Sequence, residues 1–164
     1  MKIRHVVVCC FFLTSFVFAQ TSITLSVDAT DAPRKILHAQ ETISVRPGAL
    51  TLIYPEWIPG EHGPTGPVVD VAGLHISADG KDLAWRRDLV DMYAIHTTIP
   101  SGTKEIDVRY DFLLPARASG FSAGASSSAA LLVLSWNQVL IYPSTPKPPE
   151  ITVHPSLKLP EGWK

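Results

Sequence analysis

Cysteine is almost absent from this chain, which has only Cys9 and Cys10 in 164 residues. Both lie in an apolar run near the start, in a segment of the kind that is removed from exported proteins. Without that segment the chain has no thiol, which excludes a disulfide framework, a zinc site with Cys ligands and a Cys nucleophile. The fold must then be held by its core alone. A chain of about 145 residues can do this, since it buries roughly 68–70% of its unfolded surface.

The chain also has no large excess of positive or negative charge. The chain has fourteen Lys and Arg against fifteen Asp and Glu, and loss of Lys2 and Arg4 leaves twelve bases. No basic stretch or patch stands out from this mildly acidic balance. The sequence therefore does not indicate nucleic acid or anionic lipid as a partner.

A hydrophobic run long enough to span a membrane is missing as well. The apolar run of residues 6–19 is shorter than the roughly 20 residues that a spanning helix needs. It follows a short basic region, Met1–His5, and ends at Val17-Phe18-Ala19, a small-residue cleavage site. We predict a signal peptide over residues 1–19, a single domain over residues 20–164, and a secreted or periplasmic protein without membrane contact after cleavage. An uncleaved anchor is the alternative.

The chain lacks a long amphipathic helix pattern, and short alternating segments recur instead. The clearest places Ile106, Val108, Tyr110 and Phe112 on one face of a strand. Asp79-Gly80 is a typical hairpin turn. We predict an all-β fold, an antiparallel β-sandwich. The expected strands lie at residues 23–27, 43–46, 49–54, 68–77, 83–85, 92–99, 106–112, 130–134, 139–142 and 151–154.

A rigid loop follows the expected strand at residues 49–54. Proline fixes φ and removes a backbone donor, and glycine allows positive φ. The loop contains both, with Pro55 and Pro59 before Gly60 and Gly63, and between them it holds a tryptophan and a Glu-His pair. We take the loop as the candidate ligand-facing or interdomain site, and a solvated turn is the alternative. Its candidate residues are Trp57, Pro59, Gly60, Glu61 and His62.

Residues 120–124, Gly-Phe-Ser-Ala-Gly, match the G-x-S-x-G pattern of serine hydrolases. That chemistry needs a strand before the serine, a helix after it, and a later acid and histidine. The flanks here are rich in Ser, Ala and Gly, and the chain is short and β-rich. We therefore interpret the match as a flexible loop.

Metal ligands and paired acids are not indicated. Catalytic zinc needs three convergent protein ligands, and the sequence has no H-E-x-x-H or H-x-H. We expect no catalytic and no metal residue in this chain, and we interpret His75 and His96 as structural side chains on strands. Asp88 and Asp91 fit a solvated rim between strands.

Three tryptophans could form an aromatic face that stacks against a sugar. Core packing is the usual role of tryptophan in a sandwich, so we favour core packing over sugar binding for Trp57, Trp85 and Trp136 as a group. For Trp57 the sequence leaves open whether the side chain faces the core or solvent.

Several segments together resemble the N-terminal β domain of the glycyl aminopeptidase family, secreted gluzincin-type metallopeptidases. The resemblance is carried by Leu52–Gly60, Val71–Leu74, Ala78–Leu83, Ile106–Tyr110 and the tail Leu159–Lys164. It implies a non-catalytic domain that packs on a catalytic domain, or on an adjacent chain, and shapes its cleft. The family's zinc site lies in that later domain, so the resemblance implies no cofactor in this chain and no activity of this chain alone.

The resemblance is incomplete at residues 61–67, where the family often continues Pro-Gly with Ser-Tyr. Two alternatives therefore stay open. One is a stand-alone secreted β-sandwich module that binds a peptide or a glycan, and the other is a truncated remnant of a longer protein.

Overall fold

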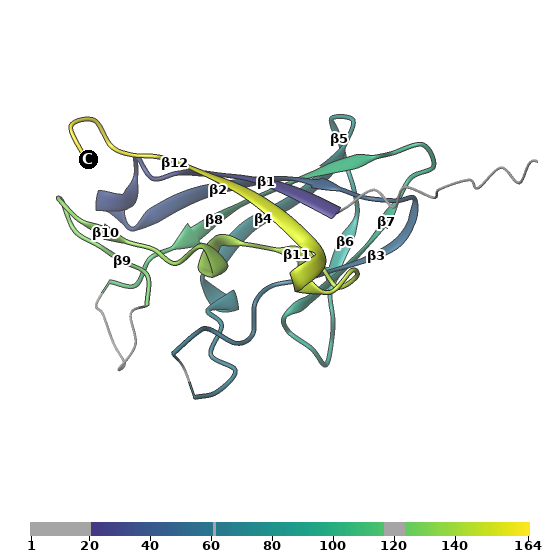
Figure 1. The fold of residues 1–164 in the computed structure, drawn as a ribbon, viewed down its shortest axis with the longest axis horizontal. Helices are drawn as coiled ribbons and strands as arrows, with labels where there is room; N and C mark the ends of the chain where they lie inside the picture. The colour runs from purple at the N-terminus through teal and green to yellow at the C-terminus, as the bar shows by residue number, and fades with distance from the viewer. Residues whose placement is uncertain (1–20, 61, 117–123) are drawn as a thin grey trace, which may run out of the picture.

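The computed structural model describes residues 21–60, 62–116 and 124–164. Within them the chain forms two main sheets and no α-helix, with four short 3-10 helices between the strands. Figure 1 shows the larger sheet running across the upper part of the molecule, with two loops projecting below. The 3-10 helices are η1 (Ala32–Arg34), η2 (Val68–Asp70), η3 (Trp136–Val139) and η4 (Pro148–Glu150).

The six-stranded sheet is built from segments in which apolar and polar residues alternate. Successive side chains of a strand point to opposite faces, so Leu25 is buried while Ser26 beside it faces out. The strand order is β12-β1-β2-β8-β4-β5. Its strands are β1 (Thr21–Asp28), β2 (Ile36–Ser44), β4 (Val71–Ala78), β5 (Lys81–Asp82), β8 (Glu105–Leu113) and β12 (Ile151–Lys158).

The four-stranded sheet has the order β11-β3-β7-β6. It contributes Leu52 and Ile95 to the core, and both are almost completely buried. Its strands are β3 (Gly48–Ile53), β6 (Trp85–Arg87), β7 (Ala94–Ile99) and β11 (Tyr142–Pro143). A separate hairpin pairs β9 (Ser126–Ser127) with β10 (Leu132–Val133).

The core confirms the predicted all-β sandwich. Buried apolar residues of both sheets form one cluster, which includes Ile23, Phe112 and Leu52. All strand pairs are antiparallel except one, because β12 lies parallel to β1 and pairs Leu25 with Pro155. Among the helices in the described ranges, none is long and apolar enough to cross a membrane.

Of two local predictions, the hairpin turn is confirmed and the bounds of one strand are wrong. Asp79 and Gly80 have φ of 49° and 74° and join Ala78 to Lys81, which confirms the hairpin turn. The strand expected at residues 139–142 is wrong in its bounds, because η3 takes up residues 136–139 and β11 begins only at Tyr142. A capping box between Ser135 and Gln138 stabilises this helical turn.

Candidate functional site

The loop after β3 starts from a firmly anchored residue. Tyr54 is fully buried, and its hydroxyl donates a hydrogen bond of 2.7 Å to the carbonyl of Gln138. Its backbone N–H donates to the carbonyl of Tyr93 at 2.9 Å. Burial raises the pKa of Tyr54 far above its usual range, so the hydroxyl remains a donor. The first residue of the loop therefore has a fixed position.

The neck of the loop is closed by Gly66. The Gly66 N–H donates to the Glu56 carbonyl at 2.8 Å, and a Cβ at Gly66 would lie 1.9 Å from the Pro55 oxygen. Only glycine allows the two backbones to approach this closely. Of the two glycines considered from sequence, Gly60 does have a positive φ of 92°, whereas Gly63 does not. The residue that closes the loop was thus missed, although its place between Thr65 and Pro67 is a turn signal.

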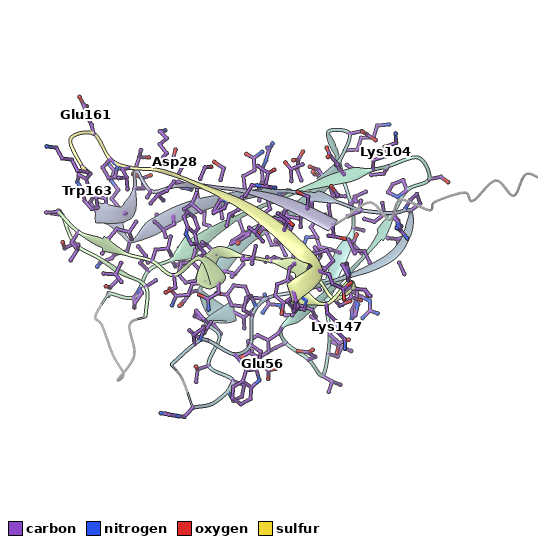
Figure 2. All side chains as sticks on the ribbon, in the orientation of Figure 1. Asp28, Glu56, Lys104, Lys147, Glu161 and Trp163 are labelled. Atoms are coloured by element: carbon purple, nitrogen blue, oxygen red, sulfur yellow. The ribbon has the colours of Figure 1, made fainter. Side chains whose placement is uncertain are left out.

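The candidate residues of the loop face solvent. Ile58 is buried and anchors the middle of the loop, while the Trp57 side chain is 61% exposed. Neither Trp57 nor His62 hydrogen-bonds to another described residue, and Glu61 lies outside the described residues. Figure 2 places Glu56, at the start of this loop, at the lower end of the molecule. The exposed candidate residues are Trp57, Pro59, Gly60 and His62.

A second loop, between β6 and β7, is held by a single carboxylate. Asp88 Oδ1 accepts the N–H groups of Val90 and Asp91 at 2.8 and 3.0 Å. Its Oδ2 pairs with His96 Nε2 at 2.8 Å, and His96 Nδ1 lies 3.0 Å from Thr51 Oγ1. The Asp91 and Val90 amides, and then His96, hold the pKa of Asp88 well below its usual range. His96 is therefore a structural histidine, as predicted.

This rigid turn presents apolar side chains to solvent. Leu89 and Val90 are 95% and 96% exposed, and Met92 is also exposed. Burying a Leu or Val side chain is worth roughly 1.5–3 kcal/mol. Leu89 and Val90 are exposed in the folded chain as they are in the unfolded one, so they contribute almost none of this energy to folding.

Tyr93 joins the two loops. Its hydroxyl donates to the Pro64 carbonyl at 3.0 Å, and its own carbonyl accepts the Tyr54 N–H. Both loops project from the lower side of the molecule in Figure 1. We call residues 56–66 and 88–92 together the loop face.

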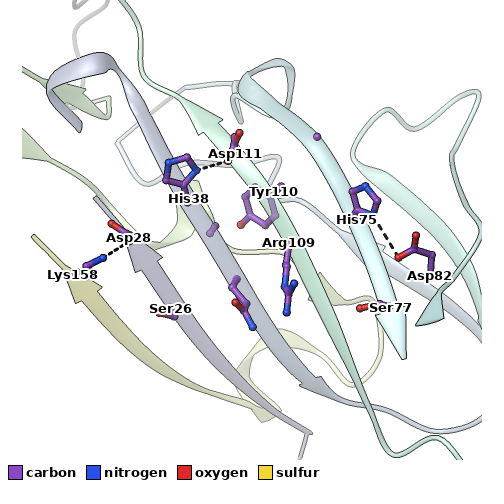
Figure 3. Close-up of a pocket in the computed structure, with 13 residues that line it drawn as sticks. Ser26, Asp28, His38, His75, Ser77, Asp82, Arg109, Tyr110, Asp111 and Lys158 are labelled. Atoms are coloured by element: carbon purple, nitrogen blue, oxygen red, sulfur yellow. Dashed lines mark hydrogen bonds and ion pairs between the residues drawn. The ribbon is translucent and has the colours of Figure 1, made fainter. Parts of the chain in front are cut away.

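A shallow polar groove of about 590 Å3 crosses the outer face of the six-stranded sheet (Figure 3). His38 Nδ1 lies 2.7 Å from Asp111 Oδ1, and its Nε2 lies 3.3 Å from Asp31. The hydrogen bond that His38 donates to Asp111 raises the pKa of His38, burial partly opposes this, and the bond to Asp31 adds to the rise. Lys158 pairs with Asp28 at 2.8 Å. The groove thus consists mainly of charges that satisfy one another.

Neither surface forms a catalytic constellation. Across the described parts of the chain, no group of three His, Cys, Asp or Glu side chains is placed to hold a metal. His75 lies 3.7 Å from Asp82, and both are exposed. Residues 120–123 of the G-x-S-x-G match lie outside the described residues, so the interpretation of that match stays a prediction.

The favoured core packing of the tryptophans is wrong for Trp85 and Trp136, which are 37% and 40% exposed and lie in the edge strand β6 and in η3. Trp57, whose placement the sequence left open, lies in a loop and is 61% exposed. Aliphatic side chains with Tyr54, Tyr110 and Phe112 form the core instead.

Comparison with protein families matches residues 24–164 to the Peptidase M61 N-terminal domain. Comparison with curated proteins gives no match. The fold is similar to that of an aminopeptidase N family protein from Idiomarina loihiensis, with a TM-score of 0.69 and 16% identity over 85% of this chain. The chain spans 22% of the length of that protein. An M1 zinc metallopeptidase from Deinococcus radiodurans also matches, with a TM-score of 0.34 and 18% identity over 68% of this chain and 24% of its own.

Proposed function

Because the chain belongs to the Peptidase M61 N-terminal domain family, we propose that it is the non-catalytic N-terminal domain of a secreted zinc metallopeptidase of the glycyl aminopeptidase kind. The family match over residues 24–164 is the observation that carries this proposal. Under this proposal, the chain packs on a catalytic domain and shapes one wall of that domain's cleft. The zinc and the catalytic residues belong to that other domain.

The loop face is the surface that the proposal assigns to this packing. Its two loops are fixed by Tyr93, by Gly66 and by Asp88, so they do not have to be ordered when a partner binds. A preorganised surface loses little conformational entropy on association. Its exposed Trp57, Leu89 and Val90 supply apolar and aromatic contacts of the kind that dominate interfaces.

Export is part of the same proposal. Residues 1–19 would be removed as a signal peptide, which leaves Gln20 as the first residue of a secreted or periplasmic protein. The intact mass of the protein recovered from the native host tests this. A mass that retains residues 1–19 contradicts it.

A binding and activity experiment tests the packing. The chain is purified and mixed with the catalytic domain of its M61 peptidase, and hydrolysis of a chromogenic glycine anilide is followed. We expect no hydrolysis by the chain alone and complex formation with the catalytic domain. A triple change, Trp57→Ser with Leu89→Ser and Val90→Ser, should weaken binding at least tenfold, while Arg109→Ala in the polar groove should leave it unchanged. Chelator-sensitive hydrolysis by the chain alone would contradict the proposal.

A second candidate is a stand-alone module that binds a peptide or a glycan. The exposed indole of Trp57, which has no hydrogen-bond partner among the described residues, is the observation that favours it. Titration calorimetry against peptide and oligosaccharide panels tests it. A heat of binding that is measured with the wild type and lost in Trp57→Ala supports this candidate. The absence of any heat of binding across both panels rejects it.

A further inference from the structure

The side chain of Glu41 lies inside the sandwich. Glu41 belongs to β2, where it shares the inward face with Leu37, Ala39 and Ile43, and it is fully buried. Lysine and glutamate are almost never fully buried unless they are paired. Its neighbours across the sheet are Leu25 on β1 and Val108 on β8, and neither carries a charge.

Both hydrogen bonds to this carboxyl go to one oxygen. Glu41 Oε1 accepts the Tyr110 hydroxyl at 3.1 Å and the Ile141 N–H at 2.7 Å. Glu41 Oε2 is buried and has no partner among the described residues. A carboxylate would leave a charged oxygen without a donor, whereas a neutral acid, with Oε1 as its carbonyl oxygen and the proton on Oε2, leaves only one O–H unpaired, which costs less.

The backbone partner, Ile141, belongs to a segment that connects the two sheets. Residues 135–144, which we call the crossing segment, contain η3 and β11. On the side of the four-stranded sheet, β11 pairs with β3, Ser144 N–H donates to Thr51, and Gln138 accepts the Tyr54 hydroxyl. On the side of the six-stranded sheet, the Ile141 N–H donates to Glu41.

Among the described residues, no positively charged group contributes to the pKa of Glu41. The titratable groups that face it are Tyr110 on β8 and, behind Tyr110, Tyr54, which in turn feels the charge of Asp70 in η2. These groups are neutral or negative. Burial therefore raises the pKa of Glu41 to about 8, and the bonds from Ile141 and Tyr110 only partly oppose this.

We propose that protonated Glu41 is a clasp that fixes the crossing segment to the six-stranded sheet, and that loss of its proton releases this segment while both sheets stay paired. A charge in this site has to reach water. The crossing segment is held by few backbone pairs, because β11 has only two residues. By contrast, β2 pairs with β8 over nine residues.

Hydrogen exchange of single amides on the whole chain tests the clasp. The protection factor of the Ile141 amide, corrected for the intrinsic rate at each pH, should fall by up to tenfold per pH unit between the ordinary glutamate pKa of 4.5 and the folded pKa of about 8, because the opened segment leaves Glu41 ionised while the closed one holds its proton. Above pH 8 it should level off. Protection of Val108 should not change. In Glu41→Gln, whose side-chain oxygen still accepts both bonds, protection of Ile141 should not depend on pH, whereas the exposed control Glu105→Gln should behave as wild type.

A flat protection factor for Ile141 in the wild type up to pH 9.5 would overturn the clasp, and so would an equal fall in Glu41→Gln. If Glu41→Gln does not fold, the carboxyl carbon resonance of Glu41 in the wild type decides. A titration midpoint near 8 supports the clasp, and a midpoint below 5 overturns it.

Discussion

Gly66 shows how a single missing side chain sets the shape of the loop after β3. A Cβ at this position would overlap the Pro55 carbonyl at 1.9 Å, so Gly66→Ala must push the neck of the loop open. Overpacking of this kind costs about 1–3 kcal/mol. We expect this loss of unfolding free energy in urea denaturation. Gly63→Ala is the matched control, since its nearest neighbour is 4.0 Å away, and an equal loss in both variants would contradict the argument.

Glu41 makes the stability of the domain depend on pH. Its folded pKa of about 8 lies above the ordinary value of 4.5, so the folded state holds the proton more tightly than the unfolded chain. The free energy of unfolding is therefore highest below pH 4.5 with respect to this group and falls as the pH rises to about 8. The full loss is of the order of 5 kcal/mol, less what opening of the crossing segment relieves.

Urea denaturation at pH 5, 7 and 9 measures this loss. The slope should be much smaller in Glu41→Gln, where only the contribution of other groups such as His38 remains, and unchanged in Glu105→Gln. Equal slopes in wild type and Glu41→Gln would assign the pH dependence to other groups.

At the scale of elements, the β6–β7 turn depends on Asp88. Asp88→Ala removes the acceptor for two backbone N–H groups and the partner of His96. Side-chain acceptors of this type hold a turn by replacing a backbone partner. We expect faster hydrogen exchange at Val90 and Asp91 and a lower midpoint of thermal unfolding. Asp82→Ala, which removes only a long contact to exposed His75, should change neither, and slow exchange at Val90 in Asp88→Ala would reject this role.

Strands could be predicted where apolar and polar residues alternate within one short segment of the sequence. Ile106 to Phe112 and Ile23 to Val27 alternate cleanly, and both segments form strands whose apolar side is buried. The position of η3 could not be predicted, because the apolar residues near Val139 fit a strand as well as a helical turn. The capping box at Ser135 was the available signal.

The candidate site was found only in part. The Pro/Gly framing around Trp57 indicated a rigid loop, but the sequence did not show whether Trp57 faces the core or solvent, and the structure shows it exposed. The second loop was taken as a charged rim, since the sequence does not show that Tyr93 reaches Pro64. Glu41 could have been noticed, because it occupies the apolar face of a strand that continues to Ile43. The core tolerates this carboxyl because Tyr110 and Ile141 donate hydrogen bonds to it, and both residues are distant from Glu41 in sequence.

At the scale of the whole molecule, the exposed apolar residues of the loop face should not matter to folding. Trp57→Ser combined with Leu89→Ser and Val90→Ser removes side chains that face solvent, and surface changes of this kind usually stay within about 0.5 kcal/mol each. Leu25→Ala in the core should cost about 2–5 kcal/mol. Urea denaturation of the two variants measures the contrast. A loss above about 2 kcal/mol in the triple variant would show that these residues serve the fold and not a partner.

The central claim is that this chain is the N-terminal part of a zinc peptidase. The most direct measurement is to read the DNA downstream of the Lys164 codon in the native gene. We predict a reading frame, continuous or adjacent, that encodes H-E-x-x-H on a helical segment with a further glutamate downstream. Unrelated sequence after a stop codon, with no such frame next to it, would contradict the claim and make a self-contained binding module the better account.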